Sequence, residues 1–264
     1  MTNRAPKPPL LDFHNLRVMR GQKIALDDFS LRIAADEHVA ILGPNGCGKS
    51  TLIKTITREG YPVARPDSFM SILGEETWNV FDLRARLGIV SNDLMLTCTG
   101  DATGREVVLS GFFSSNAIYF NHVVDSRQRA SADAALAALK ISHLADRPVC
   151  EMSSGEARRV LIARALVHQP GALLFDEPCN SLDLSAQQSL RQTMRSLANS
   201  GTAIILVTHE LADIVPEIGR VVLMDRGRVV ADGPKEEILQ VDRLAALFGV
   251  GVEMTRRDGH YHLW

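Results

Sequence analysis

Short apolar runs recur along the chain, and they differ in how polar positions interrupt them. The runs are HVAILG at 38–43, ALLFDEP at 172–178, AIILVTHE at 203–210 and RVVLMDRGRVVADG at 220–233. The second and third carry apolar residues at successive positions and do not alternate between inward and outward side chains. Strands that are covered on both faces have this pattern.

Segments with helical periodicity lie between these runs. Residues 131–140 are rich in alanine, and residues 184–201 end in Gly201, a residue typical of helix C-caps. The apolar positions of the second segment share one face: Leu190, Met194 and Leu197. Strands that alternate with helices predict an α/β fold with a mainly parallel sheet.

The stretch from 93 to 150 interrupts this alternation, because it is mostly helical in pattern and has no clear central strand. We interpret it as an inserted helical lobe. The predicted organisation is a flexible tail at 1–10, a core at 11–92 and 151–238, a helical subdomain at 93–150 and a C-terminal extension at 239–264.

Composition narrows the class of protein. The chain has 264 residues, with 29 Lys and Arg against 31 Asp and Glu, and this near balance argues against a nucleic-acid partner. The N-terminus lacks the apolar segment of a signal peptide. The most apolar long stretch, 107–124, is interrupted by serines, asparagines and a histidine. We therefore expect membrane contact only through a partner.

The segment GPNGCGKST at 43–51 fits the motif G-x-x-x-x-G-K-[ST] at every fixed position. Its glycines let the backbone turn N–H groups toward anionic oxygens, and the helix predicted to follow favours the same charge. Lys49 would reach the β- and γ-phosphates, and the Ser50 hydroxyl would bind Mg²⁺. The predicted phosphate loop comprises Gly43, Pro44, Asn45, Gly46, Cys47, Gly48, Lys49, Ser50 and Thr51.

The four cysteines form no CxxC pair, so we expect free thiols in a reducing compartment. Cys47 lies beside Lys49 and a predicted helix N-terminus, surroundings that lower a thiol pKa. This predicts that a maleimide inactivates the protein and that MgATP protects it. The alternative is that Cys47 is a small filler residue.

The run ALLFDEP ends in two acids, which places them at the carboxyl edge of the sheet, where a phosphate loop also opens. Asp176 suits the Mg²⁺ shell, and Glu177 is then positioned to polarise the attacking water. A strand-end acidic pair that only faces solvent is the alternative.

Three further segments indicate a family. MSSGEARRVLIARAL at 152–166 resembles the signature segment of ABC ATPases, usually written LSGGQ, with the helix that follows it. NSLDLSAQ is similar to the family's D-loop, with Asp183, and LVTHE is similar to its switch histidine, His209. The order and spacing match over roughly residues 11 to 238.

The resemblance implies an ATPase that works with ATP and Mg²⁺ as a head-to-tail homodimer, or with a close relative. Each ATP would lie between the phosphate loop of one subunit and the turn Ser153, Ser154, Gly155 and Glu156 of the other. That turn begins a predicted helix, where a hydroxyl and backbone amides make a second anion site. The same residues also fit a helix cap, which is compatible with this role. His209 would contact the γ-phosphate and help to hold Glu177 and water.

Three positions depart from the family pattern. Asn92 stands where the family has a glutamine, with the same amide on a shorter arm. Arg20 stands where an aromatic residue usually stacks on adenine. A guanidinium stacks on a purine, but Arg20 also fits a solvated hairpin residue. Ser154 replaces the first signature glycine and keeps the backbone donor.

The resemblance also implies integral membrane permease subunits as partners, and a peripheral location on the cytoplasmic face of the membrane. Four aromatic residues within 107–124 suit a groove for a permease helix, although some would fill the lobe's own core: Phe112, Phe113, Tyr119 and Phe120.

Residues 239–264 resemble the tails of importer ATPases for iron siderophores, related metals or cofactors, and their molybdenum relatives. The first hypothesis is therefore the ATPase of an importer of a metal chelate, oxyanion or cofactor. A soluble ABC ATPase with a regulatory role and no permease is the alternative. Repair and translation roles rank third, because the chain has no long coiled coil and only one phosphate loop.

Overall fold

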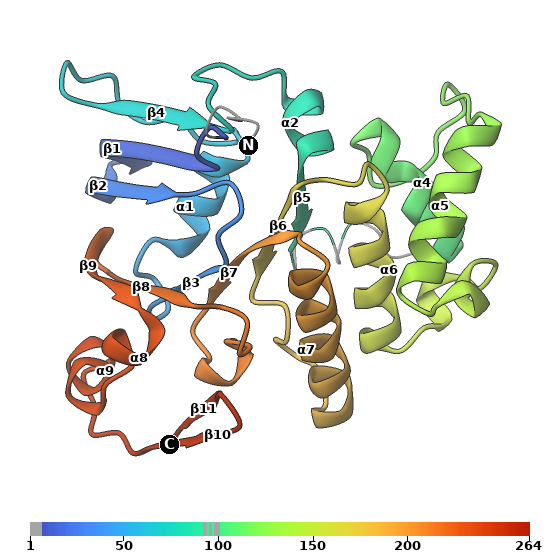
Figure 1. Cartoon of the computed structure of the whole chain (residues 1–264). Helices are drawn as coiled ribbons and strands as arrows, with labels where there is room; N and C mark the ends of the chain where they lie inside the picture. Colours follow the sequence, from blue (N-terminus) through green and yellow to red (C-terminus); the bar gives the residue numbers. More distant parts are fainter. Residues whose placement is uncertain (1–6, 92–93, 95–96, 98–100) are drawn as a thin grey trace, which may run out of the picture. The chain divides into compact units, whose positions relative to one another are not determined.

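The computed structural model describes residues 7–91, 94, 97 and 101–264. The chain forms two compact units. Figure 1 colours the chain along the sequence, from the N-terminus to the C-terminus. We call Met1–Val80 together with Ala203–Trp264 the terminal unit, and Phe81–Thr202 the central unit.

The terminal unit contains an antiparallel sheet in the order β2, β1, β4 (Figure 1). Its strands are β1 (Leu11–Arg20), β2 (Lys23–Ile33) and β4 (Phe69–Ile72). Arg20 pairs with Lys23 across a two-residue turn in which Gly21 has a φ of 61°. Glycine reaches this left-handed conformation without the strain that a Cβ brings, so the two long strands form a hairpin here.

The terminal unit also contains a mainly parallel set of strands. In it, β3 (Val39–Leu42) pairs in parallel with β7 (Ala203–Thr208) and with β8 (Arg220–Asp225). β9 (Arg228–Pro234) runs antiparallel to β8. Every residue of β3 and β7 is buried, which explains why the run that forms β7 shows no alternation.

Helices and a second hairpin complete the terminal unit. The helix α1 (Lys49–Ile56) directly follows the phosphate loop. The later elements are η4 (Leu211–Asp213), α8 (Lys235–Ile238), α9 (Val241–Phe248) and the antiparallel pair β10 (Met254–Arg257) and β11 (His260–Leu263). The pattern along the sequence did not predict this C-terminal hairpin.

In the central unit, β5 (Leu87–Val90) pairs in parallel with β6 (Ala172–Asp176). The helices that flank these strands in sequence are α2 (Val80–Arg86), α6 (Ser154–Leu166) and α7 (Leu184–Asn199). On α7 the expected face is buried at Leu190 and Met194. Gly201 follows the C-cap residue Ser200 with a φ of 90°, the left-handed geometry that ends many helices.

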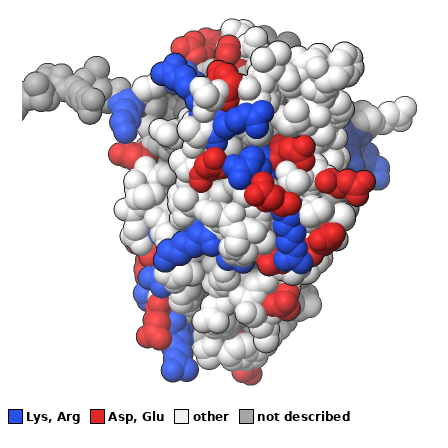
Figure 2. All heavy atoms as spheres, turned by 90° about the vertical axis from the view of Figure 1, so that its right-hand side faces the viewer, with Lys and Arg blue, Asp and Glu red and all other residues white. Residues whose placement is uncertain are grey.

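Further helices of the central unit follow β5 in the sequence. They are α4 (Gly104–Ser110), η1 (Gly111–Phe113), α5 (Ser126–Ala138), η2 (Ser142–Leu144) and η3 (Val149–Glu151). Their shared core includes Val107, Val108, Leu136 and Val160, and a capping box starts both α4 and α5. Figure 2 turns the side with α4 and α5 to the viewer, and charges of both signs are interspersed there.

The fold class predicted from the sequence is confirmed: an α/β core with a mainly parallel sheet, an antiparallel N-terminal sheet and a helical lobe. Among the described residues, none of the helices has the length and apolar character needed to cross a bilayer.

Candidate nucleotide-binding and catalytic site

The phosphate loop depends on its glycines for two different reasons. Gly46 and Gly48 have φ values of 82° and 114°, a region that side chains disfavour. Gly43 has no such φ, but a Cβ there would lie 2.4 Å from the Met224 carbonyl oxygen and 2.7 Å from the Cys47 sulfur. The backbone therefore forms a tight concave loop that ends in α1, with Gly48 as the N-cap.

Lys49 lies inside this loop. Its side chain is buried, and its ammonium donates hydrogen bonds to the carbonyl oxygens of Gly43 at 2.7 Å and Pro44 at 3.2 Å. A buried ammonium next to a ring of backbone groups and a helix N-terminus makes a positive cradle, so the residues present fit a nucleotide phosphate. Ser50, in the first turn of α1, adds a hydroxyl of the kind that binds Mg²⁺.

The end of β7 lies next to the start of the loop. Leu42 pairs with Thr208, and the Gly43 N–H donates to the Thr208 carbonyl oxygen at 3.4 Å. His209, the next residue, is thereby brought to the edge where the phosphate loop begins. Its Nε2 lies 3.5 Å from a carboxylate oxygen of Glu210.

The loop is supported from behind by the turn between β8 and β9. The Gly227 N–H donates to the Cys47 carbonyl oxygen at 2.7 Å, and the Asp27 N–H donates to the Gly227 carbonyl oxygen at 3.1 Å. A Cβ on Gly48 or Gly227 would lie 2.8 or 2.5 Å from the Ala25 carbonyl oxygen. The loop, β2 and this turn are thus in close backbone contact.

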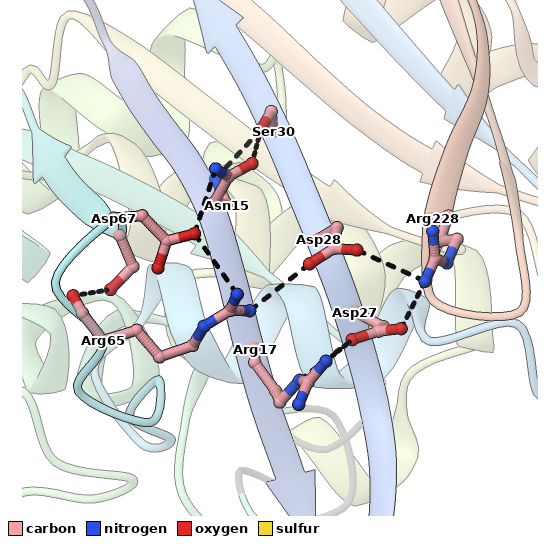
Figure 3. A network of polar contacts seen from close by, with 9 residues as sticks. Asn15, Arg17, Asp27, Asp28, Ser30, Arg65, Asp67 and Arg228 are labelled. Atoms are coloured by element: carbon pink, nitrogen blue, oxygen red, sulfur yellow. Dashed lines mark hydrogen bonds and ion pairs between the residues drawn. The ribbon is translucent and has the colours of Figure 1, made fainter.

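Charged side chains join the same strands (Figure 3). The Asp27 carboxylate accepts from Arg17 at 2.7 Å and also from Arg228, which lies 3.4 Å from Asp28. These two arginines hold the pKa of Asp27 below its usual value, Arg17 having the larger effect. Arg65 extends the network from Asp28 to Asp67. Sequence reasoning missed this support, although a glycine in the strand-joining turn DRGR is a detectable signal.

The lowered thiol pKa expected for Cys47 is not found, and the prediction that a maleimide inactivates the protein stays a prediction. The side chain is buried against Gly43, and burial raises its pKa, while the nearby Lys49 only partly opposes this effect. Desolvation disfavours the thiolate more strongly than one ammonium favours it. The other description, a small filler residue, fits the structure.

Arg20 is the last residue of β1, and its side chain is exposed beside the turn at Gly21. The prediction that it stacks on adenine stays a prediction. Asn92 lies outside the described residues.

In the central unit, the two acids lie at the carboxyl end of a parallel strand. Asp176 ends β6, and Glu177 follows with a φ of 44°, a left-handed conformation that is uncommon for a residue with a side chain. Backbone strain of this kind concentrates at functional sites, where the surrounding structure holds it. The conformation turns the chain sharply at the end of the strand, directly after Asp176.

The signature turn, which comprises residues 153–156, begins α6 with a complete capping box. The Glu156 N–H donates to the Ser153 hydroxyl oxygen at 3.3 Å, and the Ser153 N–H donates to the Glu156 carboxylate at 2.8 Å. The hydroxyl of Ser153 also donates to that carboxylate at 2.9 Å. The two hydrogen bonds that the Glu156 carboxylate accepts, first that from the Ser153 N–H and then that from the Ser153 hydroxyl, lower the pKa of Glu156. The Ser153 hydroxyl must turn from Glu156 before it can donate to an anion.

Asp183 caps the next helix, because its carboxylate accepts from the Ala186 N–H at 2.8 Å. Together the two helix starts line a hollow of about 220 Å³. Its lining includes Ser153, Gly155, Arg159, Asp183 and Ser185. The central unit thus brings together the signature turn and the D-loop residue that the sequence singled out separately.

Comparison with known proteins identifies the family. Residues 26–180 match the family described as ABC transporter. The chain is 31% identical to the hemin import ATP-binding protein HmuV of Bradyrhizobium diazoefficiens, over 95% of this chain and 92% of that protein. The cobalt import ATP-binding protein CbiO of Rhodobacter capsulatus is 36% identical, over 81% and 75%.

Solved structures agree. The chain is similar to cbiO1 from Clostridium perfringens, described as part of the ABC transporter complex cbiONQ, with a TM-score of 0.75 and 26% identity over 90% of this chain and 93% of that chain. An ATP-binding cassette of an ABC transporter in its ADP conformation shares the fold, with a TM-score of 0.78 at 23% identity over 92% and 98%. The chain belongs to the ABC transporter family and is an ATP-binding, ATP-hydrolysing protein of it.

Proposed function

We propose that this protein energises an importer by ATP-driven closure of a homodimer. Each ATP, with Mg²⁺, lies between the phosphate loop of one subunit and the signature turn of the other. The observation that carries the proposal is that one chain holds two helix N-termini suited to phosphate, at Gly48 and at Ser153. A phosphate bound at one of these helix N-termini does not need the other one of the same chain. Each ATP therefore uses the second helix N-terminus of a second copy of the protein.

Each site residue has a role in this scheme. Lys49 and the loop amides would bind the phosphates, while Ser50 and Asp176 would hold Mg²⁺, a cation that would supply charge neutralisation at phosphate oxygens. Glu177 polarises the attacking water, and His209 orients water and Glu177 beside the γ-phosphate. Asp183 fixes the D-loop, Arg20 stacks on adenine, and Asn92 takes the role of the family's glutamine.

We further propose that the helical lobe docks on a permease at the cytoplasmic face of the membrane. The lobe carries Tyr119, 47% exposed, and Phe120, fully exposed. The imported substrate belongs to the class of metal chelates, oxyanions or cofactors. The support for this class is the names of relatives that import hemin and cobalt.

The test is the variant Glu177→Gln, with Glu237→Gln as a matched control at an exposed position. Removing the carboxylate should stop turnover and leave an ATP-bound dimer, which size-exclusion chromatography with MgATP detects. The control should hydrolyse ATP at the parent rate and show no trapped dimer. Lys49→Ala should abolish nucleotide binding.

Two results would overturn the proposal. One is a Glu177→Gln protein that stays monomeric with MgATP bound and turnover blocked. The other is a parent rate per molecule that does not change with protein concentration. For the importer, purification from cytosol alone, with no multi-span partner in detergent-solubilised membranes, would favour a soluble regulatory ATPase.

A further inference from the structure

Most side chains of the C-terminal hairpin, β10 and β11, are exposed or only partly buried. Tyr261 is its one fully buried side chain, at 3% exposure, while three of the four β10 residues are exposed. The linker that precedes it, 249–251, is largely exposed and contains two glycines. A two-stranded hairpin is marginally stable alone, so its position here depends on what Tyr261 contacts.

Tyr261 covers a buried lysine. Lys235 is 3% exposed, and its ammonium lies 6.0 Å from the centre of the Tyr261 ring. It donates to the carbonyl oxygens of Pro216 at 3.0 Å and Val215 at 3.4 Å. Arg256, 5.3 Å from the same ring, is held by Glu236 at 3.2 Å.

Burial lowers the pKa of Lys235, although Glu236 and Glu217 oppose this effect. A buried ammonium is costly unless its donors are used. The ammonium of Lys235 donates to both carbonyl oxygens of one segment, Val215–Pro216.

The hairpin also contacts this segment directly. β11 packs against η4, and a Cβ on Gly259, at the hairpin turn, would lie 3.2 Å from the side chain of Pro216. The hairpin and Lys235 therefore hold the stretch from Leu211 to Pro216 from one side.

That stretch follows the switch histidine and is tied to it. The hydroxyl of Thr208 accepts from the Glu210 N–H at 3.0 Å and donates to the carboxylate of Asp213 at 3.4 Å. Thr208 and Asp213 are both buried. His209 therefore lies at the tip of a turn that is closed by a contact to η4.

We propose that Tyr261 and Lys235 are positioning residues for His209: the C-terminal hairpin holds η4 and Val215–Pro216, and these hold the turn that carries the histidine. The inference deepens the proposed function and rests on the role given there to His209. The hairpin contributes to the rate of hydrolysis and leaves nucleotide binding at the phosphate loop unchanged.

The experiment measures kcat and the ATP dissociation constant of the full-length protein for Tyr261→Ala, His209→Ala and the double variant. Tyr261→Phe keeps the ring, and Tyr61→Ala removes an exposed tyrosine elsewhere in the terminal unit. Because a small misplacement of a catalytic group is costly, we expect Tyr261→Ala to lower kcat about tenfold with an unchanged dissociation constant. The two control variants should match the parent.

The double variant tests the mechanism. If Tyr261 acts through His209, the double variant is no slower than His209→Ala alone. If the two substitutions lower kcat independently, so that the double variant is slower than His209→Ala, the inference is overturned. A kcat of Tyr261→Ala equal to that of the parent protein would overturn it as well. Lys235→Met provides a second variant if Tyr261→Ala does not fold. Lys235→Met should also lower kcat, whereas Lys235→Arg, which keeps the positive charge, should retain part of the parent kcat. A parent kcat for Lys235→Met would also count against the inference.

The outcomes separate the two proposals. A His209→Ala protein at the parent rate would show that the proposed role of His209 is wrong, and with it the positioning role. A slow His209→Ala protein beside fully active hairpin variants would leave the proposed function standing and remove the positioning role alone.

Discussion

The backbone N–H of Gly227 donates a 2.7 Å hydrogen bond to the carbonyl oxygen of Cys47. In a trans peptide the C=O and the following N–H point in opposite directions. A Cys47 carbonyl that faces Gly227 therefore turns the Gly48 N–H away from the β8–β9 turn. The turn thus sets the direction of one of the amides that we propose bind phosphate.

Gly227→Ala should disturb this arrangement. The new Cβ would lie 2.5 Å from the Ala25 carbonyl oxygen, at a φ of 78°. We expect the variant to lose about 1–3 kcal/mol of unfolding free energy and about tenfold in ATP affinity. Denaturant titration and nucleotide-binding calorimetry measure the two effects. Gly219→Ala, with no atom within 4 Å of the new Cβ, is the matched control. Unchanged ATP affinity in a folded Gly227→Ala protein would contradict this account.

Asp27→Asn tests the charge network behind the same turn. The amide cannot hold both Arg17 and Arg228 as the carboxylate does, so the start of β9 is less firmly attached to β2. We expect ATP to bind about three- to tenfold more weakly in the variant, with kcat at saturating ATP close to the parent value.

The control is Asp28→Asn, which removes the neighbouring carboxylate of the same network. Asp28 lies 3.3 Å from Arg65 and 3.4 Å from Arg228, whereas the Asp27 carboxylate holds both Arg17 and Arg228. If Asp27→Asn and Asp28→Asn weaken ATP binding equally, negative charge in general, and not the link through Asp27, supports the loop.

Features carried by local pattern could be predicted from the sequence. The buried strands appear as apolar runs because both faces are covered, and the phosphate loop appears because its glycines and Lys49 are fixed by backbone geometry. The capping box at Ser153 and Glu156 is likewise formed within four consecutive residues. These features depend on short-range interactions.

Features that depend on distant segments were missed or predicted wrongly. The link from Gly227 to Cys47 joins residues 180 positions apart, and no local pattern specifies it. The pKa of Cys47 was predicted from its neighbours in sequence, whereas burial decides its direction. The hairpin at Tyr261 is four residues per strand, too short for a clear alternating pattern.

Cysteine labelling tests the corrected view of Cys47. At pH 7.5 its raised pKa and its burial both leave little accessible thiolate, so a maleimide should label Cys47 far more slowly than the exposed Cys150. Peptide mapping by mass spectrometry distinguishes the sites, and labelling in denaturant is the control in which both react. Labelling of Cys47 in the folded protein as fast as Cys150, with loss of ATPase activity, would restore the original prediction.

Two phenylalanines of the helical lobe should respond differently to substitution. Phe112 packs against the lobe core and lies edge-on to His168, with ring centres 4.9 Å apart, whereas Phe120 is fully exposed. Phe112→Ala removes packed surface and should cost about 2–4 kcal/mol of unfolding free energy. Phe120→Ser should leave both stability and the ATPase rate of the isolated protein unchanged.

The distinguishing measurement for Phe120 is co-purification with membranes. An exposed aromatic ring gains free energy only when a partner covers it, so Phe120→Ser should weaken retention on the permease that we propose as partner. Tyr61→Ala, which removes an exposed aromatic ring from the terminal unit, is the control. If the Phe120→Ser protein co-purifies with membranes as well as the Tyr61→Ala protein does, the lobe surface around Phe120 is not the docking site.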